Sequence, residues 1–480
     1  MRRFAAAVLA LPIAGALACS RSSETPRRPS VRPSGNGLWF ANGFGSEQDQ
    51  AASLSALSQG GFSWILLPSA RVVNREGRWT VERLAAPPRP IPRAAVSAVV
   101  ESGRDATAVF EGRDKNAGKA LEEALALAAA QSVDDTRFGL VSGVHFDLPV
   151  TAAAAPAAAI AMRSLRSRLP PGTFVSVAFS EPTPQEGAEK FADLASAVDG
   201  FVAMVFGRER DQAGPEEVDI LGKPWWAAYS PNAEGRWKGR DGTEKGTLPE
   251  GFLKRLSDDP ARLLLEHDME VEERVGFGYD FRVRRSLILD GRPFAAGDEV
   301  IFRQPFLTDL VRRLGRDSAG RPNAAGRVFR FTGTSDADRI FTLPTLAQVL
   351  RGGSLDPALR VAVGRSAGTV TVAAENASPM PSALSRTSNW IEVDLGRPGI
   401  RDVRNAGFDR YEVFTASGAR VSLGRASRVR FYETLVGPGE RIQPAEILVR
   451  PPVPASCCRY RFHLLSATGE EIASDWQGGN

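Results

Sequence analysis

The chain has 480 residues, of which 43% are hydrophobic and 24% are charged. This composition is that of a folded globular protein, and it excludes wholesale disorder, a coiled coil and a protein with many membrane spans. The 60 basic and 56 acidic residues leave a net charge of only +4, so we expect no nucleic-acid partner. Three histidines and three cysteines leave little room for a zinc site. We expect no metal, no cofactor and a monomer.

The N-terminus has the layout of an export signal. Arg2 and Arg3 precede a short apolar stretch, Phe4 to Ala16, and small residues then lead to Cys19. An apolar stretch this short is typical of a signal peptide and too short to span a bilayer comfortably. The sequence therefore predicts an exported protein.

The residues around Cys19 resemble a bacterial lipoprotein signal, although Leu17 stands one place later than in the commonest pattern. The resemblance implies that residues 1–18 are removed and that Cys19 becomes the lipidated first residue, anchored in a membrane of the bacterial cell envelope. Ser20 follows the cysteine, which implies the outer membrane. Ordinary secretion with a chance cysteine is the alternative. The Ser-, Pro- and Arg-rich residues 19–37 are predicted to be a flexible tether.

Short apolar runs alternate with helical patterns from Leu38 onward. We expect strands at Leu38–Phe44, Phe62–Pro68, Ala94–Glu101, Gly139–Asp147, Phe174–Ser180, Gly200–Phe206, Pro224–Ser230 and Arg327–Thr332. Helices are expected at Glu47–Gln59, Lys115–Gln131, Ala152–Arg168, Gln185–Val198, Phe252–Glu266, Phe306–Leu314 and Leu343–Leu350. This alternation is typical of a parallel sheet covered on both faces. Eight such strands predict an α/β fold, a closed (β/α)8 TIM-like barrel over residues 38–353.

Two segments fit the repeat poorly. The Pro-rich residues Trp79 to Pro92 make a doubtful second helix, and residues 269–303 are expected to form a β-rich insertion between strands seven and eight. An open, doubly wound sheet is the alternative to the barrel. It would normally carry a glycine-rich phosphate loop after the first strand, and Asn42-Gly43-Phe44-Gly45 matches such a loop only loosely.

The pattern changes near Ser354. Residues 354–480 contain short alternating runs separated by Gly, Pro, Ser and Asn, which predicts an antiparallel β-sandwich that follows the barrel. The adjacent Cys457 and Cys458 could form an unusual bridge between neighbours or stay as two thiols.

The clearest chemical signal ends the fourth predicted strand, in Val144-His145-Phe146-Asp147. Because side chains alternate along a strand, Val144 and Phe146 are expected to face the helices, and His145 and Asp147 the barrel interior. Active sites of this architecture lie at the carboxyl ends of the strands, where Asp147 is placed.

At this point the chain resembles an uncharacterised bacterial family defined by a domain of unknown function, number 3142. The resemblance is carried by Phe146-Asp147, by the helix through Arg163 to Leu169 and by Phe174-Val175-Ser176-Val177. It extends weakly to Phe201–Gly207 and Arg327–Leu350, and His145 stands where the family's first acidic residue is expected. The resemblance implies a glycosidase-like barrel.

Glycoside hydrolysis requires two carboxyl groups that flank the scissile bond. Glu101 ends the third strand with the same parity as Ser97 and Val99, so it is the first candidate partner of Asp147. Neighbouring strands lie about 4.8 Å apart, which suits the short separation of a retaining enzyme. Glu181, just after the fifth strand, is the alternative partner.

Each candidate also has a structural interpretation. Arg208 and Arg330 fall at the ends of strands six and eight, so a ring of ion pairs could account for the acids, while both arginines remain candidates for substrate contact. His145 is expected as a hydrogen-bonded interior residue more than as a base or a substrate ligand.

Aromatic residues near the strands are a further candidate for sugar stacking. Trp225 and Tyr229 share a parity opposite to that of Trp226, so at least one tryptophan must lie in the core. We keep Tyr229 and Trp225 as candidate sugar-binding residues. The sequence thus favours a tethered enzyme similar to glycoside hydrolases that acts on a carbohydrate or cell-envelope polymer. The alternative is a non-catalytic carbohydrate-binding or scaffold lipoprotein with a degenerate barrel.

Overall fold

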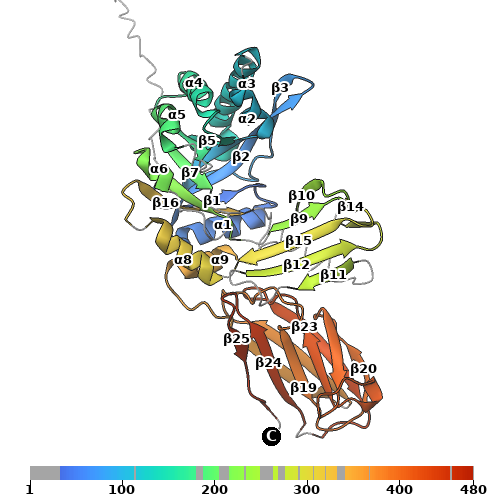
Figure 1. Cartoon of the computed structure of the whole chain (residues 1–480). Helices are drawn as coiled ribbons and strands as arrows, with labels where there is room; N and C mark the ends of the chain where they lie inside the picture. The colour runs from blue at the N-terminus through green and yellow to red at the C-terminus, as the bar shows by residue number, and fades with distance from the viewer. Residues whose placement is uncertain are drawn as a thin grey trace, which may run out of the picture.

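The computed structural model contains a barrel, a β-rich insertion and a C-terminal sandwich (Figure 1). It describes residues 33–478 except 113–114, 180–186, 205–215, 232–233, 249–262, 269–275, 290–291, 306, 319, 332–340, 367 and 455–456. The signal segment and Cys19 lie outside these residues. In the part of the chain that the structure describes, no helix has both the length and the apolar character needed to cross a membrane.

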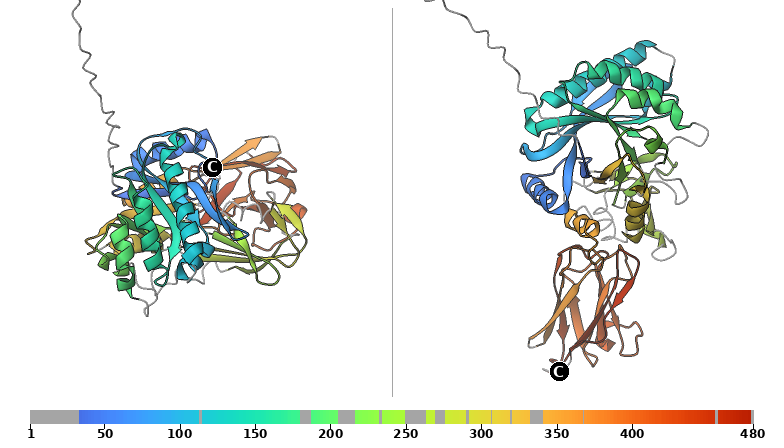
Figure 2. Two further views of the ribbon diagram at one scale, coloured as in Figure 1. Left: turned by 90° about the horizontal axis from the view of Figure 1, so that it is seen from above. Right: turned by 90° about the vertical axis from the view of Figure 1, so that its left-hand side faces the viewer.

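Eight parallel strands close into a barrel, as the sequence predicts. They are β1 (Asn36–Phe40), β2 (Phe62–Arg75), β4 (Ile91–Ser102), β5 (Gly139–Val150), β6 (Phe174–Phe179), β7 (Gly200–Met204), β8 (Trp225–Tyr229) and β16 (Ala324–Phe331). The first strand pairs in parallel with both β2 and β16, which closes the ring and excludes the open-sheet alternative. Helices α1 (Glu47–Gly60), α3 (Lys115–Asp134), α4 (Ala155–Arg166) and α5 (Ala192–Ala197) lie outside the barrel (Figure 2).

Two apolar layers result from the alternation of side chains along the strands. Residues of one parity, such as Ile65 and Val144, are buried in the core beneath the helices. Residues of the other parity fill the barrel interior, where Trp39, Trp64, Phe174 and Trp226 are buried together. Glycines on the strands make room for these large rings: a Cβ on Gly200 would lie 2.9 Å from the Trp226 ring. The interior is therefore a packed core, so reactive groups of the barrel have to lie at its rim.

The segment from Trp79 to Pro92 forms no second covering helix among its described residues. Instead β3 (Arg78–Arg83) pairs antiparallel with the extension of β2. Glu76 and Gly77 have positive φ angles of 52° and 83°, the backbone of a tight two-residue hairpin turn. Helix α2 (Arg104–Glu111) follows β4 and completes this part of the barrel wall.

The β-rich insertion lies between the seventh and eighth barrel strands, as expected, but is larger than residues 269–303. Its sheet has the order β10 (Glu244–Leu248), β9 (Glu234–Lys238), β15 (Glu299–Pro305), β12 (Gly276–Val283), β11 (Leu263–Asp268). The helix expected at Phe252–Glu266 is wrong for residues 263–266, because Leu263 to Leu265 pair with β12. The rest of that helix lies outside the described residues. Helices α8 (Leu307–Ser318) and α9 (Leu343–Leu350) match their predictions.

The C-terminal region is a two-sheet antiparallel sandwich, as predicted. One sheet contains β17 (Leu359–Ser366), β18 (Thr369–Asn376), β23 (Arg441–Val449) and β20 (Ile400–Arg404). The other contains β21 (Arg410–Phe414), β22 (Arg428–Tyr432), β19 (Trp390–Asp394), β24 (Arg459–Leu465) and β25 (Glu471–Ala473). Apolar side chains of both sheets form its core, including Val372, Ile391 and Ile447. Cys457 and Cys458 form the bridge between neighbours.

A charged network lies on the second sheet of the sandwich. Glu392 is only 2% exposed. Its Oε2 accepts hydrogen bonds from Arg430 Nε and Nη2 at 3.0 and 2.7 Å, and its Oε1 accepts from Arg461 Nε and Nη2 at 3.2 and 2.9 Å. The guanidinium carbons of these arginines lie 4.2 and 5.4 Å from the ring centre of Trp390. Two charge-assisted forks and two cation–π contacts therefore converge on one strand.

Candidate active site

The fourth barrel strand, β5, presents its chemical groups inward as predicted. Val144 and Phe146 are fully buried in the core beneath the helices. His145 is fully buried and its ring contacts Trp39 of the interior cluster at 5.2 Å between ring centres. Asp147, two residues further on, is half-buried. The parity argument from the sequence is confirmed, and it places Asp147 at the carboxyl-end rim of the barrel.

Glu101 lies directly beside Asp147. The two residues are register partners on the neighbouring parallel strands β4 and β5. Paired positions on adjacent strands are separated by about 4.8 Å, and both side chains have inward parity. The structure therefore brings together the first pair of carboxyl groups that the sequence suggests.

A third residue, Arg71, lies at the rim and was not predicted from the sequence. It is the register partner of Glu101 on β2, and its Nε and Nη2 donate to Glu101 Oε2 at 2.9 and 2.7 Å. The register of β2 slips by one residue between Pro68 and Ala70. The extra residue, Ser69, hydrogen-bonds Ser132 on helix α3. The bulge turns Arg71 inward. Regular alternation of side chains along β2 predicts the opposite face for Arg71, so the apolar pattern of the sequence does not reveal it.

The electrostatics of the rim favour a neutral Asp147. Burial raises the pKa of Asp147 to about 6, the positive charge of Arg330 opposes the rise, and the negative charge of Glu101 adds to it. Glu101 meanwhile forms its ion pair with Arg71 at 2.7 Å. One carboxyl group of the pair thus keeps its proton in mildly acidic solution, and the other is paired with a cation.

Arg330 completes the described rim from β16. It is the register partner of Trp39 on β1, and its guanidinium carbon lies 5.2 Å from the centre of the Trp39 ring. We expected ion pairing among the strand-end residues, and Arg71 pairs with Glu101. The charge of Arg330 also lowers the pKa of Asp147, which agrees with that expectation. Arg208 and Glu181, the other rim candidates, lie outside the described residues.

His145 is an interior residue and not a base at neutral pH. Its Nδ1 lies 3.0 Å from Ser176 Oγ on β6, and burial lowers the pKa of the imidazole to about 3. The ring is therefore neutral at physiological pH. Its Nε2, like the Nε1 atoms of Trp39 and Trp226, has no hydrogen-bond partner among the residues that the structure describes.

The two candidate sugar-binding residues on β8 are wrongly assigned. Tyr229 is 2% exposed and Trp225 is 0% exposed, and both belong to the core beneath the helices. Trp225 Nε1 donates to Asp219 Oδ1 at 2.8 Å. The neighbouring Trp226 is the residue that faces the interior. The sequence correctly placed Trp225 and Tyr229 on one face of β8 and Trp226 on the other, but it did not show which face is the barrel interior.

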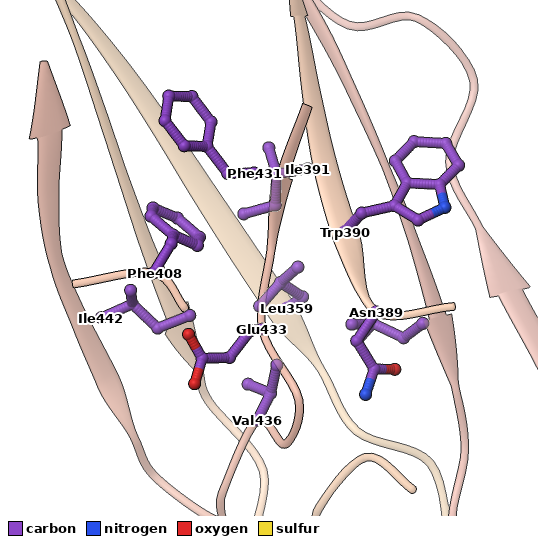
Figure 3. A pocket seen from close by; sticks show the side chains of 10 residues that line it. Leu359, Asn389, Trp390, Ile391, Phe408, Phe431, Glu433, Val436 and Ile442 are labelled. Atoms are coloured by element: carbon purple, nitrogen blue, oxygen red, sulfur yellow. The ribbon is translucent and has the colours of Figure 1, made fainter. Parts of the chain in front are cut away.

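Away from the barrel, the sandwich contains a small cavity of about 10 Å³. Apolar side chains line most of it, and Glu433 is the only acidic residue in its lining (Figure 3). A single carboxylate among apolar groups lacks the second carboxyl group that glycoside hydrolysis needs. No cluster of metal-ligating side chains is present within the described ranges.

No family model and no curated protein matches the chain, so the family resemblance stays a prediction. Similar solved structures include the spore cortex-lytic enzyme SleL of Bacillus cereus, with a TM-score of 0.37 and 10% identity over 67% of this chain and 75% of that chain. The GH18 chitinase ChiB of Flavobacterium johnsoniae has a TM-score of 0.36 and 8% identity over 66% of this chain and 94% of that chain. The barrel assignment for the present chain rests on its own strand pairing.

Proposed function

We propose that the barrel is a glycoside hydrolase-like enzyme that acts on a polysaccharide. In this proposal Asp147 is the proton donor and Glu101 is the nucleophile. The observation that carries it is the pairing of these two carboxyl groups across neighbouring strands at the rim, and burial raises the pKa of Asp147 to about 6. Environments that hold one of two adjacent carboxyl groups neutral are typical of acid and nucleophile pairs.

The proposed reaction has two steps. Asp147 transfers its proton to the glycosidic oxygen as the bond to the anomeric carbon breaks, and Glu101 forms an ester with that carbon. Asp147, now ionised, then takes a proton from water as the water oxygen attacks the anomeric carbon and releases Glu101. Both hydrogen bonds from Arg71 go to Oε2 of Glu101, so the pair leaves Oε1 for the attack.

The test is hydrolysis of a panel of neutral and acidic polysaccharides, with product anomers followed by nuclear magnetic resonance. We expect retention of anomeric configuration, because paired positions on adjacent strands are about 4.8 Å apart and retaining enzymes hold their carboxyl groups about 5–5.5 Å apart. Activity should fall as the pH rises above about 6, since Asp147 then loses its proton. Inversion of configuration would contradict the role given to Glu101.

A second function is favoured by the arginines at the rim. Arg71 pairs with Glu101, and Arg330 opposes the rise in the pKa of Asp147. Such contacts suit a non-catalytic barrel that binds envelope polysaccharide. Binding of a polymer from the panel without release of reducing ends would select this function over hydrolysis.

We further propose that the chain is an outer-membrane lipoprotein anchored through Cys19, on the basis of the residues that surround it. Replacement of Cys19 by Ser is expected to release the protein from the membrane fraction and to abolish incorporation of labelled palmitate. Mass spectrometry of the mature N-terminus checks the cleavage before Cys19. An unmodified N-terminus in the wild-type protein would favour ordinary secretion.

A further inference from the structure

Arg71 is the most exposed of the charged residues whose contacts define the described rim. Its side chain is 49% exposed, against 20% for Glu101. A guanidinium has five N–H donors in a planar fork. The two hydrogen bonds to Glu101 use the edge formed by Nε and Nη2. The opposite edge, formed by Nη1 and Nη2, can still donate two parallel hydrogen bonds to one anionic group.

The bulge in β2 and the bond to Glu101 fix this guanidinium in place. Ser69, the extra residue of the bulge, donates to Val99 O at 2.9 Å and bonds Ser132 Oγ at 2.7 Å. The backbone is thus held where Arg71 pairs with Glu101 in register. A donor fork that is already positioned loses less conformational entropy when it binds a ligand.

We infer that Arg71 determines the specificity of the proposed site by binding a carboxylate of the substrate, so that the substrate is an acidic polysaccharide containing uronic acid. This inference rests on the proposed function of the barrel. The exposure of Arg71 agrees with it, because a cation that is 49% exposed and already held by one carboxylate can meet a second carboxylate from solvent.

The experiment measures binding of three polyuronates, polygalacturonate, alginate and hyaluronan, and of the same polymers after reduction of their carboxyl groups. Calorimetry on the full chain gives affinities without requiring turnover. We expect the wild-type protein to bind at least one polyuronate, and its reduced form about 10- to 100-fold more weakly. Arg71→Gln should weaken binding of that polyuronate by a similar factor and leave binding of the reduced polymer unchanged.

Glu101→Gln separates anion binding from a purely structural role. Both Arg71→Gln and Glu101→Gln break the same ion pair, so a structural role predicts equal losses for acidic and reduced polymers. Anion binding predicts different results, because Glu101→Gln keeps the cation and removes a competing negative charge, and the Gln oxygen can still accept a hydrogen bond from Arg71. Its affinity for the polyuronate should fall much less than that of Arg71→Gln.

Arg75→Gln is the matched control. Arg75 lies on the same strand, pairs with Glu82 of β3 and has a side chain that is 71% exposed. The substitution changes net charge by the same amount away from the carboxyl pair, and polyuronate affinity should change less than about twofold. Arg71→Lys, which keeps the charge, should recover part of the affinity, and thermal unfolding verifies that each variant is folded.

The outcomes separate the two proposals. If the wild-type protein binds acidic and reduced polymers equally, the inference about Arg71 is overturned and the proposed function stands. If it binds and hydrolyses no polysaccharide of either kind, the proposed function itself fails. If Glu101→Gln loses as much polyuronate affinity as Arg71→Gln, Arg71 is a structural partner of Glu101 and the inference is overturned.

Discussion

Replacement of Asp147 by Asn is expected to lower kcat for polysaccharide hydrolysis by about 10³-fold, because an amide cannot donate the proton that the leaving oxygen requires. Asn has nearly the same volume, so the fold should be unchanged. Measurement of kcat on the best substrate of the panel, with circular dichroism as the control for folding, checks this result. Turnover at the wild-type rate would remove Asp147 from the mechanism.

The same substitution should stabilise the protein at alkaline pH. The pKa of Asp147 is about 6 in the folded protein and 3.8 in the reference state, so the folded state binds the proton more tightly between these values. The free energy of unfolding therefore falls as the pH rises from 3.8 through 6, by up to about 3 kcal/mol in total. The amide that replaces the carboxyl group does not ionise. Urea denaturation should show that the stability gained by the variant over the wild-type protein is smallest near pH 3 and reaches its full value at pH 8.

Replacement of Glu392 by Ala is the second large effect that we expect, and it concerns stability. Glu392 is 2% exposed and accepts four hydrogen bonds from Arg430 and Arg461. Its removal leaves two half-buried guanidinium groups without their shared carboxylate, which should cost about 3 kcal/mol of unfolding free energy. Calorimetry of the full chain should show a lower melting temperature for one transition, that of the sandwich.

Glu446→Ala is the control for this prediction. Glu446 accepts from Arg404 at 3.2 Å, and the two side chains are 41% and 65% exposed. An exposed pair of this kind contributes less than about 1 kcal/mol. Equal losses in the Glu392 and Glu446 variants would show that burial of the carboxylate has no special effect in this domain.

The barrel and the position of Asp147 could be predicted because apolar runs mark buried strands and parity separates their two faces. The inward position of Arg71 could not be predicted, because one extra residue in β2 exchanges the inward and outward side chains after Pro68. No local sequence pattern indicates this bulge. The wrong assignment of Tyr229 has a related reason. Both faces of β8 are apolar and fully buried, so the sequence Trp225-Trp226-Ala227-Ala228-Tyr229 does not show which face is the interior.

The size of the insertion could not be predicted because its strands are short and mixed in character. Residues 234–238 have a charged side chain at every second position and no run of β-branched residues. They nevertheless form β9, an interior strand of the sheet between β10 and β15. Its place is fixed by pairing with residues far along the chain, such as Trp237 with Val300. Contacts of that kind are set by tertiary packing, which local propensity does not record.

Closure of the barrel by its first and last strands has a consequence for biogenesis. Trp39 of β1 pairs with Arg330 of β16. One edge of β1 therefore stays unpaired until the other barrel strands and the insertion have been synthesised. Contacts this distant in sequence form slowly, and open strand edges invite aggregation. If the chain is exported as proposed, Glu101 and Asp147 cross the membrane well before Arg330. The complete rim then exists only after translocation has finished, and we expect nascent chains to depend on chaperones.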